Sequence, residues 1–369
     1  MERRSFIQHA GLAGILAAGA APAIAQTGSP EIRWRCASSF PKSLDTLFGT
    51  GEGISRRVAA LTGNRFRIQF FAAGELVPGL QALDATTSGT VECSHTVAYY
   101  YVGKDPTFGF GACMPFGLNT RQQMSWMYHG GGLDLMRELY RDYGVISFPA
   151  GNTGAQMGGW FRKEIRTVAD LKGLKMRVAG WAGQVLSRVG VVPQQLAGGD
   201  IYPSLEKGTI DAAEWVGPYD DEKLGFAKVA RYYYYPGWWE GGPQVDLMVN
   251  QKSWDALPPE YKAAVEVACA EANVDMVAKY DSLNPGALRR LVANGTQLRA
   301  FPREVMEACF KASDEQNDET AAKNPKFRKV YDAWRKYRDD QLLWFRVAEA
   351  PFDNFVQAMS ARRPAAAKK

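Results

Sequence analysis

The stretch LKMRVAGWAGQVLSRVGVVPQQL, residues 174–196, decides the fold, because it alternates between strand and helix patterns. Residues 174–179 and 191–196 are short apolar segments of the kind that form buried strands. Between them, residues 181–190 follow a glycine and carry apolar side chains at helical spacing. Two strands joined by a helix predict a parallel pair with the helix packed on the sheet. An α/β fold follows for this part of the chain.

The same alternation extends in both directions along the chain. Before this stretch the patterns predict strands at 31–39, 65–71, 90–97 and 145–150, with helices at 44–61 and 79–89. After it they predict a short helix at 202–208, strands at 209–215 and 244–250, a long helix at 258–280, and helical structure from residue 302 onward. The order implies parallel sheets with helices on both faces, built as two α/β units. In such sheets ligands bind at loops beyond the carboxyl ends of the strands.

The size and composition indicate an ordinary globular protein with room for two domains. The chain has 369 residues, of which 46% are hydrophobic and 22% are charged. The formal net charge of +5 is small, and its basic residues are dispersed except at the C-terminal tail. No basic face with a recognition motif is evident, so we expect no nucleic-acid partner.

The N-terminus has the parts of an export signal. Arg3 and Arg4 precede a run rich in Ala and Gly, and the tripeptide AIA comes directly before Gln26. The arginine pair resembles that of twin-arginine signals. We therefore expect residues 1–25 to be a signal and the mature protein to begin near Gln26. The alternative is a buried N-terminal helix, which the glycine content of the run disfavours.

The five cysteines point to buried thiols. Their number is odd, and no two of them have C-x-x-C spacing. A twin-arginine substrate folds in the reducing cytoplasm before export, so we expect free thiols. One disulfide is the alternative.

The motifs of several enzyme classes are missing. After removal of the signal only His95 and His129 remain as histidines, and the chain has no H-E-x-x-H, P-loop, G-x-S-x-G or complete G-x-G-x-x-G. These absences argue against a zinc hydrolase, a nucleotide enzyme and a serine hydrolase. They leave open an enzyme that works with carboxylates alone.

Polar residues stand at several predicted junctions between strands and loops. Gln156 follows the strand at 145–150, Arg177 lies near the end of its strand, and Glu214 ends the strand at 209–215. Gln244 begins the strand at 244–250. Each alone would be a surface residue by default, but together they suggest one binding site.

The chemistry of these residues suits an organic acid and a hard cation. The guanidinium of Arg177 matches a carboxylate in shape and charge. The oxygens of Glu214 and Gln156 suit Na⁺ or Ca²⁺ better than zinc. An anion on Arg177 and a cation on Glu214 would balance all four charges. We therefore expect these two side chains to converge across a cleft with the ligand between them.

Three segments identify a resemblance to a known family. GNTGAQMGGWFRKEIRTVADLKGLKMRVAGWAG (151–183), GTIDAAEWVGPYDD (208–221) and YYYYPGWWEGGPQ (232–244) resemble the periplasmic solute receptors of tripartite ATP-independent periplasmic (TRAP) transporters. The likeness is to the branch that binds 2-oxo and related 2-hydroxy monocarboxylates such as pyruvate. It implies that Arg177 holds the substrate carboxylate.

The resemblance also implies the other ligands of the site. Gln156, Glu214 and the main chain of Trp215 would hold a cation, Na⁺ with Ca²⁺ as the alternative. Gln156 and Trp215 would contact the substrate as well, and so would Gln244 and Tyr101.

The fold implied is that of a two-lobed periplasmic binding protein, resembling the type II class, with a long connecting helix and an extended helical C-terminus. Residues 27–150 with 243–290 would form the first lobe, and residues 151–242 with 291–324 the second. The amphipathic segment 325–361 would be an extension that can swap between subunits, so we expect a homodimer. The aromatic runs 232–235 and 238–239 are expected to pack mostly at the lobe interface and hinge.

The function implied is that of a periplasmic receptor that delivers the acid to the small and large membrane subunits of a TRAP permease. Two alternatives stay open at this point. One is an enzyme acting on carboxylic acids with Glu214 as general base, which would turn the bound acid over. The other is a sensory receptor for the same ligand, which genes for a neighbouring permease would argue against.

Overall fold

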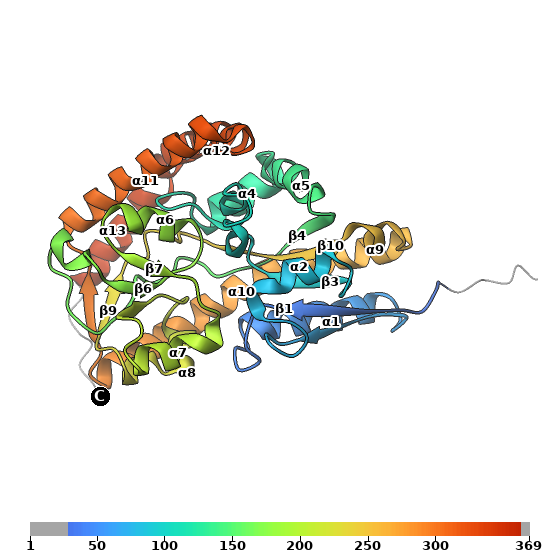
Figure 1. The fold of residues 1–369 in the computed structure, drawn as a ribbon, viewed down its shortest axis with the longest axis horizontal. Helices are drawn as coiled ribbons and strands as arrows, with labels where there is room; N and C mark the ends of the chain where they lie inside the picture. The colour runs from blue at the N-terminus through green and yellow to red at the C-terminus, as the bar shows by residue number, and fades with distance from the viewer. Residues whose placement is uncertain (1–28, 363–369) are drawn as a thin grey trace, which may run out of the picture. The chain divides into compact units, whose positions relative to one another are not determined.

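The computed structural model describes residues 29–362, and the predicted export signal lies outside this range. From Ile32 onward the chain forms one compact unit. Within it the described strands form two mixed β-sheets surrounded by helices, which confirms the α/β prediction. In Figure 1 strands β1, β3, β4 and β10 gather on one side and strands β6, β7 and β9 on the other.

The first sheet has five strands in the described part of the chain, in the order β2-β1-β3-β10-β4. Their bounds are Ile32–Ser38 (β1), Phe66–Phe71 (β2), Cys93–Thr96 (β3), Val145–Asn152 (β4) and Gln244–Asn250 (β10). Strand β1 is parallel to β2 and β3, as predicted. Strand β10 is antiparallel to β3 and β4, so the prediction of a wholly parallel sheet is wrong. The reason is that β10 arrives from the other sheet rather than through a crossover helix.

The second sheet has six strands in the same described range, in the order β11-β9-β5-β8-β6-β7. Their bounds are Gly159–Phe161 (β5), Lys175–Arg177 (β6), Val192–Gln194 (β7), Ala212–Ala213 (β8), Tyr232–Tyr235 (β9) and Gln297–Ala300 (β11). Strand β6 is parallel to both β7 and β8. The strand–helix–strand reading of residues 174–196 is therefore confirmed, with helix α6 (Trp181–Arg188) between β6 and β7.

Strands β5 and β9 were not predicted. The tyrosine run at 232–235 was expected to pack at an interface and hinge, but it forms β9, which pairs with β5 and β11. Tyr233 stacks on Trp160 of β5 with ring centroids 4.1 Å apart. Aromatic residues favour strands when they can pack on a half-buried sheet face, and here both faces have such partners.

Helices cover both sheets. The α-helices before β4 are Leu47–Leu61 (α1), Ala82–Thr87 (α2), Phe108–Ala112 (α3), Thr120–His129 (α4) and Gly132–Arg141 (α5). Those that follow α6 are Gly198–Glu206 (α7), Pro218–Leu224 (α8), Gln251–Asp255 (α9), Pro259–Ala293 (α10), Arg303–Lys323 (α11), Pro325–Val347 (α12) and Glu349–Ala361 (α13). Short 3₁₀ turns lie at Gly79–Gln81 (η1), Ala98–Tyr101 (η2), Val168–Leu171 (η3) and Phe226–Lys228 (η4). Helices α3, α4 and α5 were not predicted.

Helix α10 connects elements that belong to both sheets. It has 35 residues, which at 1.5 Å per residue is about 52 Å. It packs against α1 and β4 on one side of the molecule and against α8 on the other, and Figure 1 shows it passing both groups of strands. The prediction ended this helix at residue 280, before Pro285. The helix continues because Ala287 and Leu291 are buried further along it.

The C-terminal helices pack on the body only in part. Phe327 and Trp334 of α12 are buried against Phe110. Helix α13 has no buried residue, and apolar side chains are exposed along the end of α12 and along α13: Leu342, Leu343, Trp344, Val347, Phe352, Phe355, Val356 and Met359.

Other expectations can be compared with the described residues. All five cysteines lie in this range and are buried and free. Among residues 29–362 no helix is long and apolar enough to cross a membrane.

We predict that Trp334→Ala lowers the free energy of unfolding by about 3–5 kcal/mol, because it empties a fully buried aromatic site. Val274→Ala on α10, where the side chain is 62% exposed, is expected to change it by less than about 0.5 kcal/mol. Urea unfolding followed by circular dichroism measures both. Equal stability of the two variants would show that α12 is not part of the folded core.

Candidate functional site

A narrow cavity lies where the two sheets meet, at the carboxyl ends of β1, β3, β4, β6 and β8. Its empty volume, counted with space open to solvent, is about 280 Å³, and the room for the centre of a water-sized sphere is only about 10 Å³. The residues that line it are all buried: Phe40, Leu47, Val97, Tyr99, Tyr100, Thr153, Gln156, Arg177, Trp215, Val216 and Pro243. This is the location that the sheet-edge argument predicted. A ligand can therefore reach the cavity only after part of its wall moves.

Arg177 lines this cavity, and Glu214 lies beside it, directly before the lining residue Trp215, without lining the cavity itself. Strands β6 and β8 are parallel neighbours with Arg177 opposite Ala213, so Glu214 follows at the same sheet edge. Nη1 of Arg177 donates to the Glu214 carboxylate through Oε1 and to its main-chain oxygen at 2.7 Å. The main-chain N–H of Ala179 also donates to Oε1, at 2.9 Å. The expectation that these two side chains face each other across a cleft is therefore wrong, because both come from the same sheet.

The guanidinium of Arg177 retains an unused donor. Its Nε donates to the main-chain oxygen of Leu196 at 3.2 Å, and Trp215 lies under the guanidinium with its ring centroid 5.1 Å away. Its Nη2 makes no hydrogen bond within residues 29–362. Since Arg177 lines the cavity, this nitrogen is available to an anion there.

The electrostatics of the pair follow from its burial. Burial alone would lower the pKa of Arg177, but the Glu214 carboxylate and nearby tyrosines hold it above its usual value, so the guanidinium stays charged. Burial raises the pKa of the Glu214 carboxyl, and Arg177 and the amide of Ala179 offset part of that rise. A cation close to Glu214 would favour its ionised form further.

Two buried oxygen atoms at this place lack a hydrogen-bond donor. Oε2 of Glu214 and Oε1 of Gln156 are both buried and unpartnered within the described residues. Gln156 is oriented by its own Nε2, which donates to Thr153 Oγ1 at 3.1 Å. A buried acceptor without a donor is costly, and a hard cation is the kind of partner that an amide or carboxylate oxygen of this sort can take. The predicted ligands Gln156 and Glu214 thus fit a cation by the chemistry of their free atoms.

The kind of cation is limited by the surroundings. No group of three or more His, Cys, Asp or Glu side chains in residues 29–362 could hold a metal ion. A site with one carboxylate and otherwise neutral oxygens suits Na⁺ or Ca²⁺ rather than zinc. Trp215 lines the same cavity, and its indole Nε1 is buried without an acceptor in this range.

Two predicted contacts lie away from the cavity wall. The hydroxyl of Tyr101 bonds with Thr96 Oγ1 at 2.8 Å and accepts from the main chain of Leu83 at 3.1 Å, inside the first sheet's core. Its neighbours Tyr99 and Tyr100 line the cavity instead. The reason is the 3₁₀ turn η2, which turns consecutive tyrosines in different directions.

Gln244 is close to the cavity but does not line it. It begins β10 directly after the lining residue Pro243, and its Nε2 donates to Asp246 at 2.9 Å. Its Oε1 is buried and unpartnered in the described structure.

Sequence reasoning missed several residues here. Glu240 is buried with an unpartnered Oε2, and burial together with the charge of Glu214 raises its pKa well above the usual value. The sequence did contain a sign of this residue, because WWEGGPQ places a carboxylate between tryptophans and glycines, where a surface charge is not expected. Phe40 and Leu47 could not be found in this way, since apolar cavity walls resemble core residues in sequence.

Gly180 shows why the chain turns sharply after Arg177. Its φ of +66° lies in the region that favours glycine, and a Cβ there would come within 2.7 Å of the Tyr99 ring. The glycine therefore lets α6 begin directly behind the binding residues while Tyr99 stays in place.

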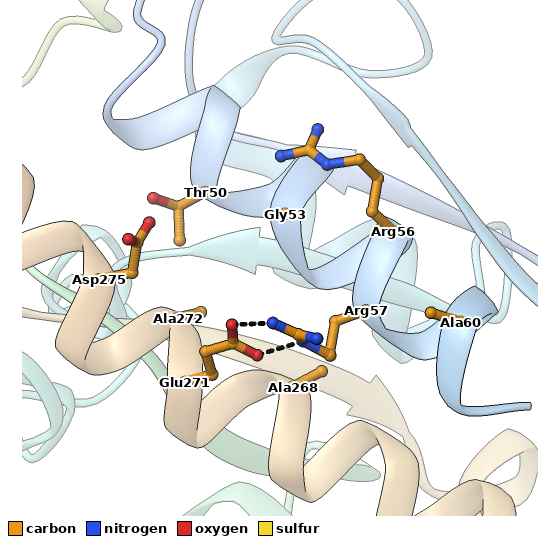
Figure 2. Close-up of a pocket in the computed structure, with 9 residues that line it drawn as sticks. All are labelled: Thr50, Gly53, Arg56, Arg57, Ala60, Ala268, Glu271, Ala272 and Asp275. Carbon is orange, nitrogen blue, oxygen red and sulfur yellow. Dashed lines mark hydrogen bonds and ion pairs between the residues drawn. The ribbon is translucent and has the colours of Figure 1, made fainter.

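A larger hollow lies on the outside between α1 and α10, as Figure 2 shows. Its empty volume is about 770 Å³, and an ion pair between Arg57 and Glu271 spans it. Both side chains are about half exposed, and none of the predicted site residues lines this hollow. Solvated ion pairs of this kind contribute little to stability, and the same exposure to water would weaken their hold on a charged ligand. We therefore assign the site to the cavity lined by Arg177 and Gln156.

Comparison with known proteins identifies the family. The model of bacterial extracellular solute-binding protein family 7 matches residues 37–324. The chain belongs to this family. Its members are receptors for solutes outside the cytoplasm, so the protein is a TRAP-type solute receptor and not an enzyme.

Individual relatives agree with this assignment. The chain is 54% identical over 333 residues to a monocarboxylate 2-oxoacid-binding periplasmic protein of Nostoc sp., covering 90% of this chain and 91% of that protein. A TRAP transporter solute-binding protein of Bordetella bronchiseptica is 53% identical, with a TM-score of 0.90 over 90% of this chain and 99% of that one. Its crystal structure is a dimer with calcium and picolinate in one site and the other site empty.

A third relative carries a different cation. The solute-binding protein of Pseudoalteromonas atlantica is 38% identical, with a TM-score of 0.85 over 88% of this receptor and 99% of that chain. It was crystallised with sodium and pyruvate.

We predict that millimolar CaCl₂ or NaCl raises the melting temperature of the receptor, since a bound ion stabilises the folded state. Gln156→Leu should remove most of this shift because it deletes an unpartnered oxygen. Gln123→Leu is the matched control, since Gln123 is equally buried but donates to the main chain of Phe110. Differential scanning fluorimetry measures the shifts, in a buffer from which metal ions have been removed before each salt is added. An undiminished shift in Gln156→Leu would remove this residue from the cation site.

Proposed function

We propose that this receptor binds a small 2-oxo or 2-hydroxy monocarboxylate, such as pyruvate, together with a cation. The observation that carries the proposal is that Arg177 and Gln156 line one cavity, that Arg177 is paired with Glu214, and that within residues 29–362 Nη2 of Arg177 makes no hydrogen bond and one oxygen each of Gln156 and Glu214 has no partner. The anion would bind to Arg177 and the cation to Glu214, so that with Na⁺ the charges of these four groups sum to zero. A keto or hydroxyl oxygen beside the carboxylate could complete the cation's coordination.

The cavity favours a small acid. It has room for the centre of a water-sized sphere over only about 10 Å³, so its walls must part to admit even a short acid, and Phe40, Leu47 and Val97 give it an apolar wall. A short acid with one carboxylate, one further oxygen and a small apolar tail matches this lining. The relatives described as binding 2-oxoacids and pyruvate support the same class of ligand.

The carboxylate contact alone does not give tight binding. Micromolar affinity needs about 8 kcal/mol, whereas one charge-assisted hydrogen bond contributes about 1.5–3 kcal/mol. The cation, the apolar wall and the exclusion of water must supply the rest. We assign Na⁺ as the first choice and Ca²⁺ as the alternative, because relatives carry one or the other.

The proposed roles are as follows. Arg177 binds the carboxylate, and Gln156, Glu214 and the main chain of Trp215 hold the cation. Gln156 and Trp215 also contact the acid. Tyr100 replaces Tyr101 as the tyrosine that contacts the acid, because Tyr100 lines the cavity. Its main-chain oxygen accepts a hydrogen bond from Gln195 at 2.8 Å. Gln244 remains a nearby candidate.

The cellular setting follows from the family and the N-terminus. We propose that residues 1–25 direct export, that the receptor works in the periplasm, and that it delivers the acid to the small and large membrane subunits of a TRAP permease. The two sheets would belong to two lobes, divided as the sequence predicts, that open and close around the cavity.

A homodimer is supported by the exposed apolar side chains of α12 and α13. Phe352, Phe355 and Met359 of α13 are exposed although apolar, and such a surface on a soluble protein marks an interface. The dimeric relative of Bordetella bronchiseptica agrees with this proposal. Exchange of the C-terminal helix between subunits would bury these residues.

We predict that pyruvate binds the wild-type receptor with micromolar affinity when Na⁺ or Ca²⁺ is present, and that Arg177→Ala abolishes binding. Glu214→Gln should weaken it in a cation-dependent manner. Isothermal titration calorimetry against 2-oxo and 2-hydroxy acids, with and without each cation, measures this. Arg188→Ala on neighbouring α6 is the control, because Arg188 pairs with Glu319 at the surface. Unchanged affinity in Arg177→Ala would contradict the assignment of the carboxylate site.

We predict that Phe352→Asp with Phe355→Asp converts a dimer to a monomer while pyruvate affinity is kept, because neither residue lines the cavity. Size-exclusion chromatography with light scattering gives the mass. A wild-type protein that is monomeric at high micromolar concentration would contradict the dimer.

A further inference from the structure

The segment that carries Glu214 and Trp215 ends in two consecutive aspartates, Asp220 and Asp221, at the start of α8. Both are buried, and neither lines the cavity. Their side chains bond to different parts of the molecule. Helix α8 therefore connects the second sheet, on one side of the binding site, with the start of α1 and with α10 on the other.

Asp221 attaches α8 to the second sheet. Its Oδ2 accepts from Trp160 Nε1 of β5 at 2.9 Å and from the Tyr233 hydroxyl of β9 at 2.7 Å. These two residues also stack on each other. Helix α8 is therefore fixed to the sheet that provides Arg177 and Glu214.

Asp220 attaches the same helix to the other side. Its Oδ1 accepts from the hydroxyl of Thr46 at 2.6 Å, and its Oδ2 accepts from the hydroxyl of Tyr280 on α10 at 2.7 Å. Thr46 directly precedes α1, which packs beside the first sheet. All three side chains are fully buried, so these hydrogen bonds are shielded from water.

A partly exposed group of charges surrounds this buried contact. Asp45 accepts from Lys223 of α8, from Lys279 of α10 at 2.8 Å and from the Tyr219 hydroxyl at 3.2 Å. The Asp45 side chain is 48% exposed, so this outer layer contributes less than the buried hydroxyls. It still joins the same two segments, residues 45–46 and α8.

These contacts continue directly into the cavity wall. Leu47 follows Thr46, and Val216 lies four residues before Asp220; both line the cavity. Because every lining residue is buried, ligand exchange requires some walls to separate. Parting the Leu47 wall from the Val216 wall would break the hydrogen bond between Thr46 and Asp220.

We propose that Thr46 and Asp220, supported by Tyr280, form a latch that holds the closed receptor around its ligand and sets the rate of ligand release. The proposal rests on the proposed function as a carboxylate receptor. Asp221 is the fixed attachment of the latch and Asp220 its releasable side. Neither Thr46 nor Asp220 touches the ligand, so both act as positioning residues.

The test uses Thr46→Val, which keeps the shape of the side chain and removes its hydroxyl while Asp220 keeps Tyr280. Asp45→Asn is the second variant, for the case in which Thr46→Val folds poorly. Glu222→Gln is the matched control, since Glu222 lies on the same helix but pairs with Arg290 of α10 at the surface. Melting temperatures of all variants report on folding.

Two readouts follow. Stopped-flow dissociation of pyruvate in the presence of CaCl₂ should be about tenfold faster in Thr46→Val than in wild type or Glu222→Gln, as expected for loss of one charge-assisted hydrogen bond. Double electron–electron resonance measures the distance between spin labels attached at Lys104→Cys and Lys207→Cys. In the absence of ligand this distance should be longer in Thr46→Val than in the otherwise wild-type receptor. Both positions are exposed, and the native cysteines are buried.

The outcomes separate the two proposals. Dissociation rates and distances in Thr46→Val that match those of Glu222→Gln would overturn the latch, and so would a lowered melting temperature with neither readout changed. If the wild type binds no 2-oxo or 2-hydroxy acid, the proposed function fails. The ligand-free distance measurement then still decides whether these residues hold the molecule closed.

Discussion

The buried pair of Arg177 and Glu214 is the interaction on which the rest of the site depends. A guanidinium and a carboxylate removed from water must be paired, and their positions follow from one register, Arg177 of β6 opposite Ala213 of β8. The pair uses only part of each group, since one nitrogen of the arginine and one oxygen of the glutamate have no partner within residues 29–362. A buried pair with unused capacity is well suited to receive an anion and a cation together, because adding both keeps the site neutral.

The fold places this pair where a ligand can be both enclosed and released. Strand ends of both sheets supply the cavity wall, and α10 packs against β4 of the first sheet and against α8, which Asp221 attaches to the second. The stretch from Glu214 to Asp221 takes part in both binding and closure. It carries the Glu214 carboxylate at one end, and near the other end Asp220 accepts a hydrogen bond from Thr46. Ligand binding and closure are in this way built on one short segment that leads from β8 into α8.

Much of this could be predicted from sequence, and the failures have physical reasons. The strand–helix–strand at 174–196 was predictable because its periodicity is local, and Gln156, Arg177 and Glu214 stood out as polar residues at strand ends. The antiparallel β10 and the strand β9 depend on pairing between distant segments, which local patterns do not contain. The substitution of Tyr100 for Tyr101 depends on the direction of single side chains in a 3₁₀ turn, and a one-residue shift is enough to reverse it.

The central claim is that the organic anion and the cation bind as one neutral unit at the Arg177–Glu214 pair. It is tested most directly by measuring the affinity for Na⁺ by calorimetry with and without saturating pyruvate, and the affinity for pyruvate with and without saturating Na⁺. The account predicts that each ligand tightens the other by the same factor, of at least about tenfold, since coupling between two sites is reciprocal. Affinities that are independent of the other ligand would contradict it.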